Sequence, residues 1–210
     1  RDLRPRPAFG GGPPRKPARL GHSCHPDRRR RAAEAERPRA KRADAPAAIA
    51  EYRRAIAIDP TFVPAYANLA DLYRVRGVEG EAVAALREGL ARNPRAAMLH
   101  HTLGLALVRQ KQTAEGLKAL RRAVELAPES ARFAFVHAVA LKDTGQAREA
   151  LKVLATSLKR EPYDRDLLSG LAYFTAEVGD REAALGYVRQ LRLLDPENAQ
   201  YAQMEKQIEG

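Results

Sequence analysis

The sequence contains no tryptophan, one cysteine, two methionines and five phenylalanines in 210 residues. Because Cys24 is alone, no internal disulfide can form, and the cysteine content says nothing of the redox compartment. No stretch approaches the roughly 18 apolar residues of a membrane-spanning helix. Hydrophobic residues still make up 45% of the chain, so the core must consist mainly of alanine and leucine.

A secretory signal is missing as well. The first residue is Arg1, and the order of charged, apolar and small residues that marks a signal peptide is absent. The chain has the character of a fragment, so a targeting signal upstream stays open. The compartment is therefore undetermined between the cytoplasm and the periplasm.

The net charge of +11 would ordinarily indicate nucleic acid or an anionic membrane as a partner. Residues 1–42 carry 14 Lys and Arg against 4 Asp and Glu, a net charge of +10, which leaves +1 for residues 43–210. The main argument for a nucleic-acid-binding body is thereby removed, and we expect no nucleic-acid partner.

Residues 1–42 also hold seven of the 14 prolines and few large apolar side chains. Such a segment cannot offset its ordering entropy by burial, so we expect it to be disordered. Three origins stay open: a flexible basic linker, translation of GC-rich coding sequence in a wrong frame, and an arm whose Arg28–Arg31 run contacts phosphates or another anionic surface.

The stretch GHSCH, Gly21–His25, lacks one cysteine of the C-x-x-C-H haem-attachment motif. His22, Cys24 and His25 could also bind a metal, but three ligands within four residues of a disordered segment are weak evidence. We expect neither a cofactor nor a metal.

The strongest signal is a proline that recurs every 34 residues. Repetition at this period is typical of a solenoid, in which each unit buries its apolar face against its neighbours. We expect a half unit at 43–62, full units at 63–96, 97–130, 131–164 and 165–198, and a capping helix at 199–210. The prolines are Pro60, Pro94, Pro128, Pro162 and Pro196.

Each full unit is predicted to form two antiparallel helices joined by a short turn. Small residues at the eighth and twentieth positions would let the two helices approach closely. The fifteenth position is glycine in three units, where a helix must end. The second unit has Lys111 there, which predicts a longer or less regular turn. The small pairs are Ala70 and Ala82, Gly104 and Gly116, Ala138 and Ala150, and Ala172 and Ala184.

This pattern resembles the tetratricopeptide repeat over about residues 43–210. The resemblance implies an all-α, right-handed solenoid of helix pairs. The units also resemble those C-terminal to some bacterial multihaem cytochrome-like proteins. In the first unit the resemblance is carried by Tyr66, Leu69, Ala70, Tyr73, Ala82, Leu86, Gly89 and Pro94.

Residues 43–210 contain no nucleophile–base pair, metal-ligand spacing or phosphate-binding loop, so we expect no enzyme. The resemblance implies that the first helix of each pair lines a concave groove for a protein or peptide partner. The apolar residues of the middle two units, with Arg109, Arg132 and Lys142 near them, predict a partner with apolar anchors and an acidic group. The alternative is the C-terminal repeat region of a larger bacterial enzyme or c-type cytochrome. His100 and His137 are expected in the core and His101 on the groove. The predicted groove residues are Asn68, Asp71, Arg74, His101, Leu105, Val108, Arg109, Arg132, Phe135, Val139, Lys142 and Tyr173.

Overall fold

The computed structural model describes residues 45–210; the expectations for residues 1–42, including GHSCH, lie outside this region. The described residues form ten α-helices and no strand. None of these helices is long and apolar enough to span a bilayer. The helices are α2 (Ala45–Ile58), α3 (Val63–Val75), α4 (Glu79–Arg92), α5 (Ala97–Arg109), α6 (Thr113–Leu126), α7 (Ala131–Asp143), α8 (Ala147–Leu158), α9 (Arg165–Glu177), α10 (Arg181–Leu194) and α11 (Ala199–Glu209).

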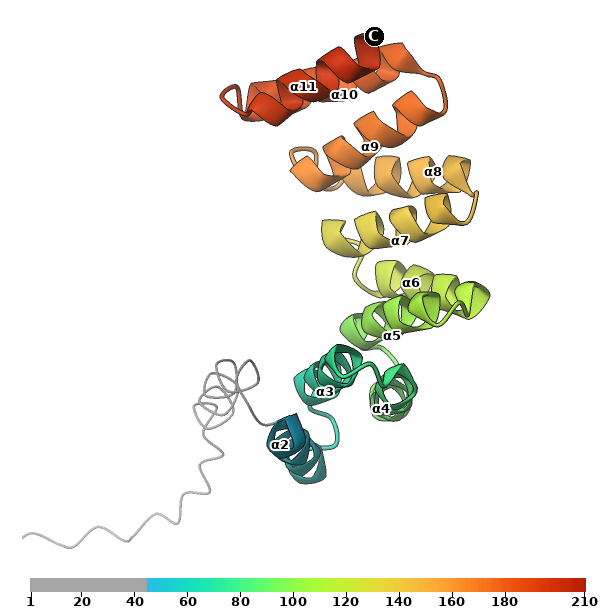
Figure 1. Cartoon of the computed structure of the whole chain (residues 1–210), viewed down its shortest axis with the longest axis vertical. Helices are drawn as coiled ribbons and strands as arrows, with labels where there is room; N and C mark the ends of the chain where they lie inside the picture. The colour runs from blue at the N-terminus through green and yellow to red at the C-terminus, as the bar shows by residue number, and fades with distance from the viewer. Residues whose placement is uncertain (1–44) are drawn as a thin grey trace, which may run out of the picture. The chain divides into compact units, whose positions relative to one another are not determined.

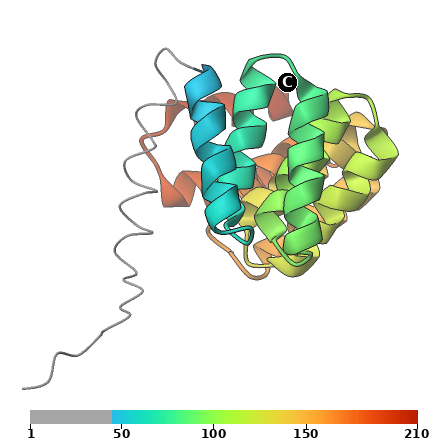
Figure 2. The same ribbon diagram turned by 90° about the horizontal axis from the view of Figure 1, so that it is seen from below.

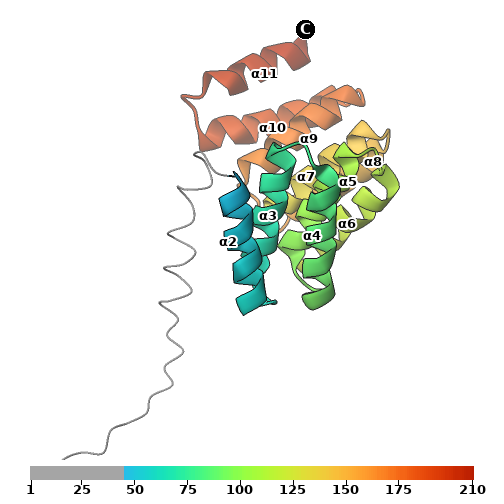
Figure 3. The same ribbon diagram turned by 60° about the horizontal axis from the view of Figure 1, so that its bottom comes forward.

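Helices α3 to α10 form four antiparallel pairs, with α2 before them and α11 after them, and each helix packs against the next (Figure 1). Figures 2 and 3 show α2, α3 and α4 side by side, and Figure 3 shows α11 lying along α10 at the other end. The first helices of adjacent units also touch, α3 against α5 and α7 against α9. This architecture confirms the predicted all-α solenoid of helix pairs.

Small residues bring the two helices of the second pair together. A Cβ atom added to Gly104 of α5 would lie 2.6 Å from Cγ of Leu120 and 2.9 Å from the carbonyl oxygen of Gly116, both on α6. Even alanine, which the other three units have here, would not fit without movement. The pair α5 and α6 is therefore packed backbone to backbone.

The turns within the pairs share one backbone conformation. Gly77, Gly145 and Gly179 have φ of +73°, +79° and +90°, and Lys111 has φ of +62°. The amide of Lys111 donates to Val108 at 2.9 Å and the next amide donates to Leu107 at 2.9 Å, as in the glycine turns. The prediction of an irregular turn at Lys111 is wrong, because lysine adopts the left-handed conformation that glycine adopts elsewhere.

The recurring proline also provides a hydrogen-bond acceptor. The hydroxyl of Tyr66 donates to the Pro60 carbonyl at 3.1 Å, and Nε2 of His100 lies 2.9 Å from the Pro94 carbonyl oxygen. Tyr66 and His100 occupy the same position of successive units. His100 is thus half-buried with a polar partner rather than enclosed in the core.

The buried apolar core has a boundary between the second and third full units. One cluster runs from Tyr52 of α2 to Ala119 of α6, and the next from Ala134 of α7 to Phe174 of α9. Helix α6 contributes half-buried Leu117 and Val124 to the second cluster. Two smaller clusters join α9 and α10 to α11.

Candidate partner-binding face

We call the solvent-facing sides of α3, α5, α7 and α9 the first-helix face. It contains most of the predicted groove residues. Asn68, Asp71, Arg74, Arg109, Arg132 and Tyr173 are exposed, and Leu105, Val108, Phe135, Val139 and Lys142 are half-buried.

His101 differs from its prediction. It is buried, with 2% of its surface exposed, and its ring stacks on Phe133 of α7 with centroids 4.5 Å apart. Phe133 is buried as well, with 7% of its surface exposed, so His101 is not available to a ligand. Burial, followed by the positive charge of Arg132, lowers the pKa of His101 to about 4.

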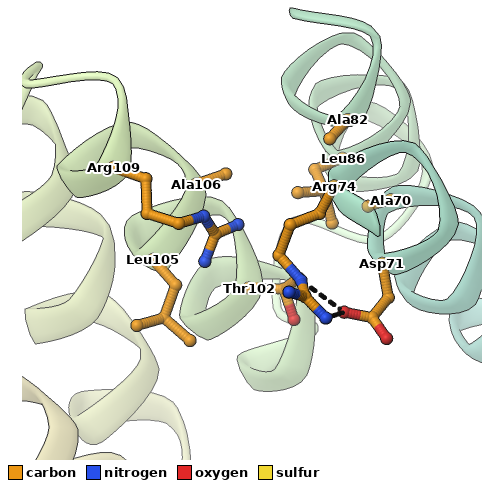
Figure 4. A pocket seen from close by; sticks show the side chains of 9 residues that line it. All are labelled: Ala70, Asp71, Arg74, Ala82, Leu86, Thr102, Leu105, Ala106 and Arg109. Carbon is orange, nitrogen blue, oxygen red and sulfur yellow. Dashed lines mark hydrogen bonds and ion pairs between the residues drawn. The ribbon is translucent and has the colours of Figure 1, made fainter. Parts of the chain in front are cut away.

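A small pocket of about 90 Å³ opens where α3, α4 and α5 meet (Figure 4). Its floor is made of small apolar side chains together with Leu86, and Arg74 and Arg109 lie on opposite sides of its mouth. The full lining is Ala70, Asp71, Arg74, Ala82, Leu86, Thr102, Leu105, Ala106 and Arg109.

Both arginines of this pocket already have acidic partners. Arg74 pairs with Asp71 at 2.8 Å, and the hydrogen bond to that carboxylate raises the pKa of Arg74. Arg109 donates through Nε to Glu79 at 2.7 Å and through Nη2 to the same carboxylate at 3.3 Å. Sequence reasoning missed Glu79, which comes from the second helix α4. An acidic ligand would have to compete with these carboxylates.

A second polar cluster lies between α7 and α9. Nζ of Lys142 is 3.2 Å from Oε1 of Glu177, and it lies 5.0 Å from the ring centroid of Tyr173 and 5.6 Å from that of Phe174. The hydrogen bond with Glu177 raises the pKa of Lys142. Cation–π contacts at these distances are attractive. Tyr173 nevertheless remains 52% exposed.

The middle of the face combines apolar side chains with one unpaired cation. Phe135 and Val139 of α7 are half-buried and pack against the second core cluster. The Phe135 ring fills the space beside Gly170, where an added Cβ would lie 3.0 Å from it. Within residues 45–210, Arg132 forms no ion pair, unlike Arg74, Arg109 and Lys142.

Val108 has a different role from the one predicted. Its Cγ2 would lie 2.8 Å from a Cβ on Gly116, so this side chain packs against the second helix of its own unit. Val108 therefore contributes to the packing of α5 against α6 rather than to a surface that a partner could contact. No group of three or more His, Cys, Asp or Glu side chains in the described region is arranged to hold a metal.

Stacked helix pairs with a continuous first-helix face define a class of repeat proteins that act as interaction scaffolds. Comparison with family models gives two matches: residues 51–84 match a tetratricopeptide repeat, and residues 80–201 match the cytochrome c-type biogenesis protein H TPR domain. The chain belongs to this tetratricopeptide-repeat family. A search of curated proteins finds no match.

Solved structures share the fold. A structure from the functional characterization of Pseudomonas aeruginosa pilF has a TM-score of 0.69 at 20% identity, covering 87% of this chain and 83% of its own. YrrB, a TPR protein with an unusual peptide-binding site, has a TM-score of 0.60 at 25% identity, and the match covers 77% of this chain and 84% of YrrB. MamA has a TM-score of 0.64 at 18% identity, and the match covers 82% of this chain and 94% of MamA.

Proposed function

We propose that this interaction module binds a segment of a partner protein, an extended peptide or a helix, across the middle of the first-helix face. The observation that carries the proposal is that exposed Tyr173, half-buried Phe135 and Val139, and Arg132 belong to the same face, and that Arg132 forms no ion pair within residues 45–210. Exposed aromatic rings and arginines are the residues that contribute most to protein interfaces. The apolar residues would receive anchors of the partner, and Arg132 would bind an acidic group.

YrrB, a TPR protein with an unusual peptide-binding site, shares this fold and supports the proposal that a peptide binds here. The paired charges narrow the proposal further. Arg74 and Lys142 pair with carboxylates of the face and Arg109 pairs with Glu79 of α4, so Arg132 is the cation that we assign to the partner's carboxylate. We propose no catalytic role for any of these side chains.

A library of random twelve-residue peptides, displayed on phage and selected on the full chain, tests this function. Selected peptides are expected to bind Tyr173→Ala and Arg132→Glu at least tenfold more weakly than the wild type. The matched control is Arg189→Glu, an equal charge change on the exposed side of the second helix α10. Equal affinity for all three variants would refute the assignment of this face.

Phe135→Ala and Arg109→Glu are less suitable variants, although the sequence suggested them. Phe135 belongs to the core packing around Gly170, and Arg109→Glu would place two carboxylates together at Glu79. Either substitution would lower stability as well as affinity. Tyr173 and Arg132 are exposed, so their replacement leaves the helices intact.

A second candidate function concerns the identity of the partner. The match of residues 80–201 to the cytochrome c-type biogenesis protein H TPR domain favours a partner in the biogenesis of c-type cytochromes. We propose an unfolded apocytochrome c as the ligand to test, with the folded haem protein and an unrelated unfolded chain of equal length as controls. Fluorescence anisotropy should show binding of the apocytochrome and no binding of either control. Equal binding of the unrelated unfolded chain would refute this candidate.

A further inference from the structure

The joint between the second and third full units differs from the other joints of the array. Helix α6 contributes to both of the two largest apolar clusters: the first ends at Ala119, and half-buried Leu117 and Val124 pack against the second. On the first-helix side, α5 and α7 approach each other less closely than α3 and α5 or α7 and α9. On the first-helix side, this joint therefore has the least contact among the joints between adjacent full units for which first helices face each other.

Two buried histidines lie at this joint. His101 of α5 is 2% exposed and His137 of α7 is 3% exposed. All four of their ring nitrogens are buried without a hydrogen-bond partner in the described structure. His101 contacts α7 through its stack on Phe133. His137 occupies the position at which the other full units have Leu69, Leu103 and Leu171.

Neutral imidazole tolerates such a site as a flat, mostly apolar ring, whereas imidazolium carries a charge and two donors that would have no acceptor. No charged neighbour stabilises the imidazolium of His101, because the charged group that influences its pKa is the cation Arg132 of α7, which lowers it. At His137 the neighbours are mixed, with Arg121 and Glu125 on α6 and Glu149 on α8. Burial is the largest influence on both rings, and it favours their neutral forms.

We propose that the joint between α5–α6 and α7–α8 is a proton-sensitive hinge, which His101 and His137 hold closed as neutral rings and open when they are protonated. Opening lets water and counterions reach the rings while the apolar clusters on either side stay folded. The first-helix face would then bend between Leu105 and Phe135. The hinge belongs to the array itself and does not depend on the proposed partner.

Distance measurements between spin labels test the hinge. In a Cys24→Ser background, labels at Ala84→Cys on α4 and Gln190→Cys on α10 span the joint, and labels at Thr156→Cys and Gln190→Cys lie on one side of it. Between pH 7.5 and pH 4.0 we expect a second, shifted distance population for the spanning pair. The pair on one side should keep its distance.

The double variant His101→Phe and His137→Leu is the matched control. Phenylalanine keeps a ring on Phe133, and leucine is the residue of the other units, so the variant should fold with the same helical circular dichroism. Its spanning distance is expected to be independent of pH over this range. The same shift in the double variant, no shift in the wild type, or simultaneous loss of both label distances would each overturn the proposal.

Discussion

Replacing Lys111 by glycine should stabilise the array. Lys111 holds φ at +62° in the turn between α5 and α6, where the other three units have glycine at φ between +73° and +90°. Its side chain is exposed, and its backbone makes the same pair of hydrogen bonds as those glycines. The substitution therefore changes backbone strain and removes no contact that holds the turn.

The magnitude follows from two opposing effects. A side chain in the left-handed conformation costs about 1–2 kcal/mol. Glycine also increases the conformational entropy of the unfolded chain, which offsets about 0.4–1 kcal/mol of the gain in stability. The net stabilisation is about 0.5–1 kcal/mol. The reciprocal change, Gly145→Lys, should cost a similar amount, because an added Cβ there meets nothing within 4 Å and only the backbone is strained.

Urea unfolding followed by far-UV circular dichroism measures both changes as shifts of the midpoint at constant slope. Lys111→Ala separates the effects, since it removes the charge and keeps the strained φ, and it should leave the midpoint close to that of the wild type. The reasoning is refuted if Lys111→Gly is no more stable than Lys111→Ala, or if Gly145→Lys is neutral.

Two further predictions concern the interior. The pKa of His101 is about 4 in the fold and 6.5 ordinarily, so the unfolded chain binds more protons between these values. Stability should be complete above about pH 6.5 and fall by about 3 kcal/mol as the pH drops to 4; urea midpoints across this range should show this loss reduced in His101→Phe. In the second pair, Gly104→Ala should cost about 1 kcal/mol, because overpacking against Leu120 exceeds the gain in helix propensity. Gly80→Ala, where a Cβ meets nothing within 4 Å, should instead raise the thermal midpoint, and equal effects would contradict the packing argument.

The repeat could be predicted from the sequence because its constraints are local and periodic. A 34-residue spacing of proline, small residues and turn glycines determines helix ends and the close pairing of helices. Thus α7 spans Ala131–Asp143 and ends just before the turn glycine Gly145. The Lys111 turn shows the limit, since the hydrogen bonds of the turn determine its conformation even where the preferred residue is absent.

The candidate face was less accessible to sequence reasoning because it depends on side-chain rotation and on contacts between units. The repeat phase places both His101 and Tyr173 on the groove, but the structure buries the first and leaves the second 52% exposed. The stack of His101 on Phe133 has no signal in the spacing of one unit. Likewise, the carboxylate that compensates Arg109 comes from α4 of the preceding unit.

Charged residues on the second helices show a pattern that crosses from unit to unit. The twenty-fifth position of one unit is arginine where the nineteenth position of the next is glutamate. Arg87 and Glu115 form such a pair at 2.8 Å. Between the third and fourth units both positions are alanine, Ala155 and Ala183, and both are half-buried. The same register places Arg53 with Glu81 and Arg121 with Glu149 in the sequence. In the structure, however, Arg53 donates to the Tyr73 hydroxyl at 3.0 Å, and Glu149 lies 3.9 Å from Nζ of Lys152.

Introducing the pair at Ala155 and Ala183 tests whether these two positions face each other as Arg87 and Glu115 do. Both alanines are half-buried and Ala155 packs against the second core cluster, so Ala155→Arg and Ala183→Glu should each lower stability alone. The double variant should be more stable than the sum of the single effects by about 0.2–1 kcal/mol, the value of exposed ion pairs. A double-mutant cycle on urea midpoints isolates this coupling, with Arg87→Ala and Glu115→Ala as the matched cycle on the existing pair. Because salt screens exposed charges, both couplings should shrink in 1 M NaCl, where the Debye length is about 3 Å. Coupling for Arg87 and Glu115 without any between the introduced residues would show that the fourth unit is stacked in a different register, and that the two alanines are part of its own packing.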